Sequence, residues 1–233
     1  MRKIVIIPAA GSGTRCKSDI PKQFIKINNR EILFYTLQAF ENHNGIDDII
    51  VVTSKEYFEL IQNISEKYKI SKFKAVVEGG KERQDSVYNA LIYILNNLKP
   101  NSDDIILIHD AARPLINSKI ISNIIENVLK YDASVTAIKA KDTILEVLDN
   151  SVSGFVNREK IYYAQTPQAF KFNVIYECFK KSYEQNLYFT DESTMLKYFG
   201  YNVFITIGDI FNFKITTPDD LELLKKILGK NGN

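Results

Sequence analysis

Short apolar segments rich in β-branched residues alternate five times with amphipathic helical segments, and this alternation constrains the fold more than any other feature. The strands are predicted at residues 4–7, 49–52, 75–77, 105–108 and 134–138. Between them, apolar residues recur at the spacing of one helix face. No long linker interrupts the pattern, so we expect a single domain over residues 1–233. Its predicted class is α/β, a mostly parallel twisted sheet with helices on both faces.

Helix boundary signals continue this pattern towards the C-terminus. Asn117 or Ser118 is expected to cap a helix that follows the fourth strand. Helices are predicted at 174–183 and 193–200, and a strand at 203–205. The last helix is predicted to start with Thr217 as its cap, followed by Pro218 and two acidic residues.

Residues 141–165 interrupt the alternation. Residues 143–148 are rich in strand formers, Asp149-Asn150-Ser151 is a turn cluster, and Phe155-Val156 begins a return strand. The core sheet does not require this hairpin, so we expect it to project as an arm and to build a dimer. The alternative is an irregular loop that folds onto its own subunit.

The first strand leads into a loop of small residues, 8–15, which contains Gly11 and Gly13. Bare backbone amides in such a loop can form a concavity for an anion. Arg15 and Lys22 add positive charge beside it, so the loop is predicted to hold a polyphosphate. The alternative is an ordinary strand-to-helix turn.

Two familiar phosphate loops do not fit this spacing. A P-loop requires Gly-Lys-Ser/Thr after the second glycine, where this chain has Gly13-Thr14-Arg15. The dinucleotide fingerprint requires a small residue at position 16 and an acid after the second strand, where Cys16 and Thr53-Ser54 stand. The loop therefore suits transfer chemistry on a nucleoside triphosphate better than passive cofactor binding.

Two more strand ends carry chemically useful residues, and strand ends are where open α/β sheets bind ligands. Residues 79–86 follow the third strand, and 109–114 follow the fourth. Asp110 is a candidate for Mg²⁺ or for a ribose hydroxyl, or alternatively an ion-pair partner of Arg113. His109 is interpreted as a packed strand-end histidine. Arg158, residues 190–192 and residues 212–216 are further candidate substrate contacts.

The composition excludes several partners. The formal net charge is +2, and basic residues do not cluster, so nucleic acid is not an expected partner. Apolar runs are too short to span a membrane. The two cysteines, Cys16 and Cys178, lack metal-ligand spacing and are interpreted as reduced thiols of a cytoplasmic protein.

The stretches that carry chemistry occur in a characteristic order over nearly the whole chain. They are Pro8-Ala9-Ala10-Gly11-x-Gly13-x-Arg15, Pro21-Lys22-Gln23, Gly79-Gly80-x-x-Arg83-x-x-Ser86-Val87, His109-Asp110-Ala111-Ala112-Arg113-Pro114, Asp142-Thr143, Arg158, Gln165-Thr166-Pro167-Gln168, Thr190-Asp191-Glu192 and Lys214-Ile215-Thr216-x-Pro218-x-Asp220-Leu221. In this combination the chain resembles the 2-C-methyl-D-erythritol 4-phosphate cytidylyltransferase family of isoprenoid biosynthesis. The resemblance implies a Rossmann-like nucleotidyltransferase fold.

The resemblance also implies a reaction and its residues. CTP and 2-C-methyl-D-erythritol 4-phosphate would give 4-diphosphocytidyl-2-C-methyl-D-erythritol and pyrophosphate, with Mg²⁺. The implied catalytic residues are Arg15, Lys22 and Lys214. The implied CTP-binding residues are Ala9, Ala10, Gly11, Gly13, Gly80, Ser86 and Asp110, with Asp110 also the candidate metal ligand. The implied sugar-phosphate residues are Arg113, Thr143, Arg158, Thr190 and Lys214.

The implied assembly is a homodimer in which the arm crosses to the second subunit, so that Thr143 and Arg158 serve the neighbour's site. A substrate phosphate oxygen would attack the α-phosphorus in line, and catalysis would rest on positioning and on charge stabilisation by Arg15, Lys22 and Mg²⁺. No protein nucleophile is needed.

Three alternatives stay open from the residues. Ribitol-5-phosphate cytidylyltransferases share the architecture but tend to begin Leu-Ala-Gly-Gly, so Pro8-Ala9-Ala10-Gly11 and Ala112 favour methylerythritol phosphate. A nucleotide-dependent oxidoreductase is opposed by the missing acid after the second strand. The third alternative is a non-catalytic nucleotide sensor.

Overall fold

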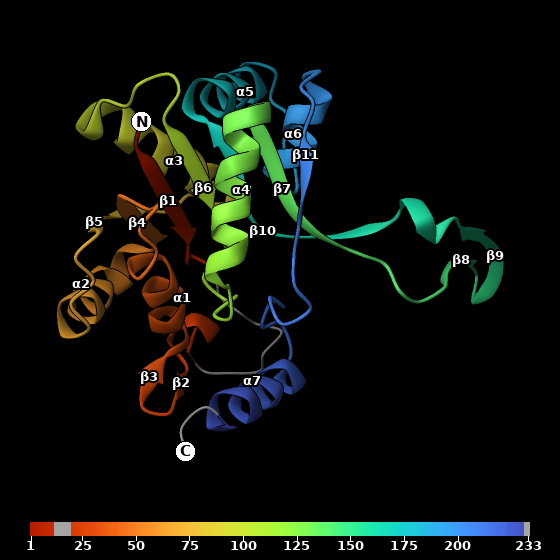
Figure 1. Ribbon diagram of the computed structural model, residues 1–233, viewed down its shortest axis with the longest axis horizontal. Coiled ribbons are helices and arrows are strands. Elements are labelled where there is room, and N and C mark those ends of the chain that lie inside the picture. Colours follow the sequence, from red (N-terminus) through yellow and green to blue (C-terminus); the bar gives the residue numbers. More distant parts are fainter. Residues whose placement is uncertain (12–19, 231–233) are drawn as a thin grey trace.

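The computed structural model describes residues 1–11 and 20–230, and within them seven strands form one sheet in the order β11-β7-β10-β6-β1-β4-β5 (Figure 1). The strands are β1 (Lys3–Pro8), β4 (Asp48–Thr53), β5 (Phe73–Glu78), β6 (Ile105–Ile108), β7 (Ala133–Lys139), β10 (Tyr162–Lys171) and β11 (Phe204–Ile207). Neighbours pair in parallel except at β10, which is antiparallel to both β6 and β7. The predicted mostly parallel α/β sheet is confirmed.

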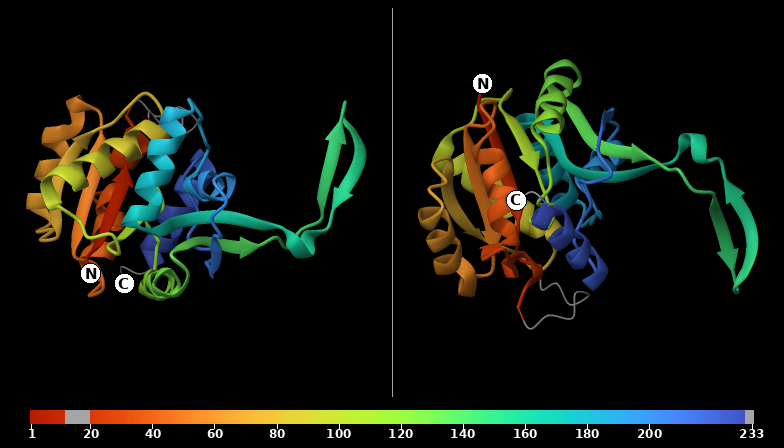
Figure 2. Two further views of the ribbon diagram at one scale, coloured as in Figure 1. Left: turned by 90° about the horizontal axis from the view of Figure 1, so that it is seen from above. Right: turned by 60° about the horizontal axis from the view of Figure 1, so that its bottom comes forward.

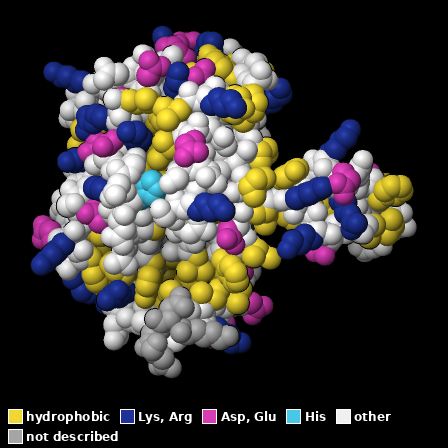
Figure 3. All heavy atoms as spheres, in the orientation of Figure 1, with side chains coloured by type: hydrophobic (Ala, Val, Ile, Leu, Met, Phe, Trp, Pro, Cys, Tyr) yellow, Lys and Arg dark blue, Asp and Glu magenta, His cyan; other side chains and the backbone are white. Residues whose placement is uncertain are grey.

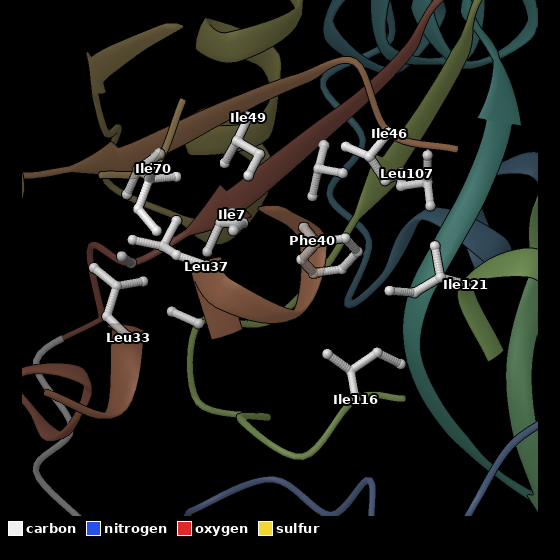
Figure 4. Close-up of a cluster of buried hydrophobic side chains, with 14 of the residues drawn as sticks. Ile7, Leu33, Leu37, Phe40, Ile46, Ile49, Ile70, Leu107, Ile116 and Ile121 are labelled. Carbon is white, nitrogen blue, oxygen red and sulfur yellow. The ribbon is translucent and has the colours of Figure 1, made fainter. Parts of the chain in front are cut away.

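Helices cover both faces of the sheet, as the alternation predicted. One face carries α1 (Ile32–Glu41), α2 (Phe58–Lys67) and α4 (Ser118–Tyr131); the other carries α3 (Arg83–Tyr93), α5 (Phe172–Glu184) and α6 (Glu192–Tyr198). Successive strand residues point to opposite faces. Val5 and Ile7 of β1 therefore join the cluster beneath α1, drawn in Figure 4, whereas Ile4 and Ile6 join the cluster beneath α3 and α5.

The remaining elements lie at the rim of this sheet. A small hairpin, β2 (Lys26–Ile27) and β3 (Arg30–Glu31), turns through two asparagines with positive φ. Helix α7 (Pro218–Lys230) packs through Leu224 against Ile215 and Ala112, next to the end of β6. Among the residues described, no helix is both long enough and apolar enough to cross a bilayer.

Two predicted caps are present. The side chain of Asn117 accepts a hydrogen bond from the backbone N–H of Ile120 at 3.0 Å and starts α4. The hydroxyl of Thr217 accepts from the backbone N–H of Asp220 at 3.3 Å and starts α7. Each bond satisfies a backbone donor that the first helical turn leaves without an intrahelical partner.

Strand β10 departs from the sequence-based expectation. The pattern predicted a hairpin up to residue 165 and no strand between it and the helix at 174–183, whereas Tyr162–Lys171 forms a strand in the interior of the sheet. Its middle is polar and contains Pro167, which cannot donate to a ladder. The pairing of β10 with β7 shifts register between Ala164 and Gln168, and the proline lies within this irregularity. The polar, proline-containing run obscured the strand.

The interrupting segment forms the predicted projecting hairpin. Strands β8 (Ile144–Leu148) and β9 (Ser151–Val156) pair antiparallel and extend away from the main body (Figures 1 and 2). Asp149 and Asn150 make the turn with φ values of 50° and 60°, a backbone conformation that these residue types tolerate. We call residues 141–161 the arm.

Candidate functional site

A pocket of about 330 Å³ lies at the carboxyl ends of β1, β5 and β6. The described residues that line it are Pro8, Ala9, Ala10, Gly11, Lys22, Gln23, Gly80, Lys81, Glu82, Arg83, Ser86, Asp110, Ala111, Ala112 and Lys214. Three strand ends therefore meet here, as the position of ligand sites in open α/β sheets predicts.

The loop after β1 is anchored by the glutamine of the Pro-Lys-Gln stretch. Gln23 is buried, and its side-chain amide donates to the carbonyl of Ala9 at 2.6 Å and to that of Gly11 at 3.1 Å. Gln23, which lines the pocket as well, thus fixes the path of the loop. The predicted site residues Gly13 and Arg15 lie outside the described residues.

In the loop between β5 and α3, the backbone of residue 80 lies so close to Asp85 that residue 80 must be glycine. A Cβ added at Gly80 would lie 2.1 Å from the Cβ of Asp85. The Gly80 N–H donates to Ser86 Oγ at 3.1 Å, and the Ser86 hydroxyl donates to the carbonyl of Glu82 at 3.2 Å. Glu82 and Asp85 form a reciprocal capping box at the start of α3. The loop is therefore internally braced before any ligand arrives.

Asp110, at the end of β6, is surrounded by positive charge. Its Oδ2 lies 3.1 Å from Lys214 Nζ and accepts from Arg113 Nε at 3.2 Å, while Oδ1 lies 3.9 Å from Arg83 Nε. Burial opposes ionisation of this carboxyl, but Lys214, Arg83 and Arg113 outweigh it and hold the pKa of Asp110 well below its ordinary value. The predicted pairing with Arg113 is present, as one contact of a larger cluster.

His109 is fully buried beside this cluster, which confirms its interpretation as a packed histidine. Its Nε2 lies 3.1 Å from the carbonyl of Arg113, which can only accept, so Nε2 carries the proton. Its Nδ1 lies 3.2 Å from Thr166 Oγ1. Burial lowers the pKa of His109 to about 4, although the bond to the Arg113 carbonyl opposes this. The ring is neutral and lies outside the pocket lining.

The predicted cations occupy distinct positions. Lys22 donates to the carbonyl of Ile215 at 2.6 Å, which links the first loop to the segment before α7. Lys214 lines the pocket, with its side chain 36% exposed. Arg113 is buried instead, and its second contact is the carbonyl of Asn212 at 2.7 Å. Arg113 is not among the residues that line the pocket, and its contact with the sugar phosphate stays a prediction.

Three predicted sugar-phosphate residues do not meet the pocket. Thr143 and Arg158 lie on the arm, both exposed, and Arg158 donates to the carbonyl of Lys141 at 3.2 Å. Thr190 is exposed just before α6. Its neighbour Asp191 caps α6 by accepting from the N–H of Thr194 at 2.9 Å, and Glu192 is buried. Neither Asp191 nor Glu192 is among the residues that line the pocket.

Sequence reasoning assigned no role to Arg83, Gln23 or Glu82, which also line the pocket. Arg83 and Glu82 lie in the strand-end stretch 79–86 that the sequence singled out, although neither received a role of its own. Gln23 could not be found this way, because its function is to bind backbone carbonyls that only the fold brings near.

The described residues contain no group of three or more His, Cys, Asp and Glu side chains able to hold a metal ion. Asp110 offers one carboxylate oxygen, Oδ1, that is not within hydrogen-bond distance of a cation among residues 1–11 and 20–230. Such a donor fits a Mg²⁺ that takes most of its ligands from phosphates and water, not a site built by protein alone.

Comparison with known proteins agrees with this geometry. Residues 3–230 match the family described as 2-C-methyl-D-erythritol 4-phosphate cytidylyltransferase. A protein of that name from Clostridium botulinum (strain Loch Maree / Type A3) is 44% identical over 230 residues, covering 97% of each chain. The crystal structure of 4-diphosphocytidyl-2C-methyl-D-erythritol synthase from Anaerococcus prevotii DSM 20548 has a TM-score of 0.84 at 32% identity, covering 98% of this chain and 96% of that one. The cytidylyltransferase of Francisella tularensis has a TM-score of 0.81 at 36% identity, covering 97% and 99%.

Proposed function

The chain belongs to the 2-C-methyl-D-erythritol 4-phosphate cytidylyltransferase family, and from this membership we propose how its pocket residues share the work of the reaction. The enzyme is a nucleotidyltransferase of isoprenoid biosynthesis that transfers a cytidylyl group from CTP to 2-C-methyl-D-erythritol 4-phosphate, forming 4-diphosphocytidyl-2-C-methyl-D-erythritol. The observation that carries the assignment of residues is the meeting of a small-residue loop, the Gly80 loop and the Asp110 cluster in one pocket.

The nucleotide occupies the side of the pocket formed by the first two loops. Backbone amides of Ala10 and Gly11, together with Lys22, are assigned to the triphosphate, and so are Gly13 and Arg15 of the same loop. Ala9 lines this side of the pocket with its small side chain, because its own N–H donates to the carbonyl of Val52 at 2.7 Å. The braced Gly80–Ser86 loop receives the cytosine end, which is supported by the position of Gly80 and Ser86 in the pocket wall. Asp110 Oδ1 accepts a ribose hydroxyl, since an ionised carboxylate is a pure acceptor.

The polyol phosphate occupies the side of Lys214. The ammonium of Lys214 lies 3.1 Å from Asp110, so it stands between the ribose position and the second substrate. We assign Thr190 to the same half of the site. We also assign Arg113 to this half, where its buried guanidinium holds Asp110.

The chemical step requires only two phosphates and fixed charges. An oxygen of the polyol phosphate attacks the α-phosphorus of CTP, the bond to the β-phosphate oxygen breaks, and pyrophosphate leaves with the electron pair. Nucleotidyltransferases generally use divalent metal ions, and Mg²⁺ bound to the triphosphate would neutralise part of its charge. Lys22, Arg15 and Lys214 hold the reacting phosphates in line and stabilise the charge that develops on them.

The arm completes the site of a second copy. Its exposed apolar side chains include Phe155 at 82% exposure and Leu148 at 67%, an unusual density for a solvent-facing hairpin. Hydrophobic side chains are visible at the far end of the arm in Figure 3. We assign the enzyme to a homodimer in which Thr143 and Arg158 reach the pocket of the other subunit, which accounts for their distance from their own pocket.

Two further assignments concern the whole enzyme. We assign it a single nucleotidyltransferase domain that carries the arm, and we place it in the cytoplasm. All three apolar clusters pack on or beside one sheet, which supports the first. A reducing compartment is supported by Cys178, which is buried as a free thiol.

Pyrophosphate release tests the proposal. Purified enzyme mixed with CTP, Mg²⁺ and methylerythritol phosphate is expected to release one pyrophosphate for each nucleotide product formed, and ribitol 5-phosphate run in parallel is expected to be a poor substrate. Preference for ribitol 5-phosphate would reassign the second substrate. Tight CTP binding without release from either polyol phosphate would favour a sensor.

A further inference from the structure

Glu192, the first residue of α6, is a buried carboxylate whose hydrogen-bonding capacity is only half used. It is 1% exposed, and its Oε1 accepts from Nη1 of Arg83 at 2.5 Å. Its Oε2 is buried without a hydrogen-bond partner among the described residues. It does not line the pocket, but its partner Arg83 does.

Stability alone is a poor explanation for this carboxylate. Burying a charge with one oxygen unpaired disfavours folding, and a buried ion pair often adds nothing over apolar residues of similar size. Helix α6 does not need Glu192 to begin, because Asp191 already caps it through the N–H of Thr194. Neither stability nor helix capping therefore explains Glu192, and we look for its role in the contact with Arg83.

Arg83 lies between two carboxylates on opposite sides. Nη1 is bound to Glu192, while Nε lies 3.9 Å from Oδ1 of Asp110, beyond hydrogen-bond length. Nη2 makes no hydrogen bond to any described residue, and the Arg83 side chain is 31% exposed in the pocket wall. Without a counter-charge at residue 192, attraction to Asp110 would draw the guanidinium into a bidentate pair with it.

We propose that Glu192 is a positioning residue for CTP: its buried carboxylate holds Arg83 away from Asp110, so that the free N–H groups of Arg83 and the Oδ1 of Asp110 both remain available to the nucleotide. This inference rests on the CTP site assigned above. It predicts that the negative charge of Glu192, and not only its shape, sets the affinity for CTP.

The test is a double-mutant cycle with CTP binding measured by calorimetry, which does not depend on turnover. Glu192→Gln keeps the shape and an accepting oxygen but removes the charge. It is expected to weaken CTP binding about 10- to 100-fold, the range for one charge-assisted hydrogen bond. Arg83→Gln should weaken it similarly, and adding Glu192→Gln to Arg83→Gln should have no further effect. The KM for the polyol phosphate should change less than about twofold.

Glu184→Gln, which removes an exposed carboxylate at the end of α5, is the matched control and should bind CTP as the wild type does. The inference is overturned if Glu192→Gln binds CTP within about twofold of wild type, if the two substitutions weaken binding independently, or if both substrates are weakened equally. If Glu192→Gln does not fold, Arg83→Lys replaces it. One ammonium cannot reach both Glu192 and the nucleotide, so wild-type affinity in that variant would also overturn the inference.

Pyrophosphate release by the wild-type enzyme tests the proposed reaction separately from the role of Glu192. Absence of pyrophosphate release would refute the reaction while leaving the CTP calorimetry to judge the role of Glu192. Normal release together with unchanged CTP affinity in Glu192→Gln would refute only the positioning role.

Discussion

Individual side chains of the same type do different work in this pocket, because their surroundings differ. Lys22 is anchored by a backbone carbonyl next to the small-residue loop, whereas Lys214 is held by the ionised Asp110 at 3.1 Å. The first lies beside the proposed triphosphate and the second between the proposed substrates. Substitution of each should therefore affect a different kinetic constant.

Lys22→Ala should lower kcat/KM by about 10- to 100-fold, because one charge-assisted contact to the reacting phosphates is lost. Initial rates of pyrophosphate release over a range of CTP concentrations measure the effect. A loss below about tenfold would remove Lys22 from the mechanism.

Lys214→Ala should raise the KM for the polyol phosphate by about tenfold and leave CTP affinity nearly unchanged. Steady-state kinetics with each substrate varied in turn, together with CTP calorimetry, separate the two constants. Equal weakening of both substrates would contradict the assignment of Lys214 to the polyol-phosphate side.

His109 should make stability depend on pH between its unfolded and folded pKa values. Its pKa is about 4 in the folded protein against an ordinary 6.5. Between these two pH values the imidazole is protonated in the unfolded chain but neutral in the native state. The contribution of neutral His109 to the free energy of unfolding is fully present above pH 6.5. It falls by about 3 kcal/mol as the pH is lowered towards 4. Urea unfolding at several pH values measures it.

His109→Gln should flatten this part of the profile, whatever its effect on stability at pH 7. The other histidine, His43, is present in both proteins, so the difference between the two profiles isolates His109. Asp110 acts in a different range, because its lowered pKa affects stability only below the ordinary carboxyl value. Parallel profiles for the two proteins would show that His109 does not titrate as proposed.

Among the local elements, the β5–α3 connection shows how a loop is prepared before it binds a ligand. The Glu82–Asp85 capping box closes the start of α3, and Tyr183 from α5 donates to Asp85 at 2.5 Å. The backbone of residue 80 lies directly against Asp85, which takes part in both contacts. A single added methyl group is therefore enough to disturb it.

Gly80→Ala should lower the free energy of unfolding by about 1–3 kcal/mol and weaken CTP binding, because its Cβ cannot fit beside Asp85. Gly229→Ala is the matched control: it lies in α7 with nothing within 4 Å of the added Cβ, and is expected to stabilise the helix slightly. Thermal unfolding and calorimetry with CTP compare the two. A neutral Gly80→Ala would show that the loop relaxes freely.

For the molecule as a whole, the sheet and the arm differ in how far their apolar side chains are buried. The sheet buries two continuous apolar clusters, one on each face, whereas β8 and β9 pair only with each other and leave large apolar side chains in solvent. An isolated two-stranded hairpin is marginally stable in water. The arm therefore gains most from a second copy of the chain.

Phe155→Ser should weaken the dimer without lowering the stability of the subunit, because this ring is 82% exposed within one subunit. Light scattering at micromolar concentration should show a dimer for the wild type and a larger monomer fraction for the variant. The monomer should retain CTP binding but lose affinity for the polyol phosphate. Leu95→Ser, at an exposed apolar residue beyond α3, is the control and should stay dimeric. A monomeric wild type would contradict the shared site.

Much of this protein could be predicted from local sequence. Strand and helix patterns, the caps at Asn117 and Thr217, and the turn at Asp149-Asn150 depend on residues close together in the chain. The three strand-end loops were also predictable, because parallel strands end at one edge of a sheet. For the same reason the meeting of these loops in one pocket could be expected before any geometry was known.

The tertiary structure alone decided how distant segments meet. No local pattern marks β10 as antiparallel between β6 and β7, because strand order is set by hydrogen bonds between segments far apart in the chain. Nor does any motif reveal that Glu192 holds Arg83, or that Arg83, Arg113 and Lys214 share Asp110. Periodicity reports which face of an element is buried, whereas the balance of buried charges depends on which elements the fold packs together.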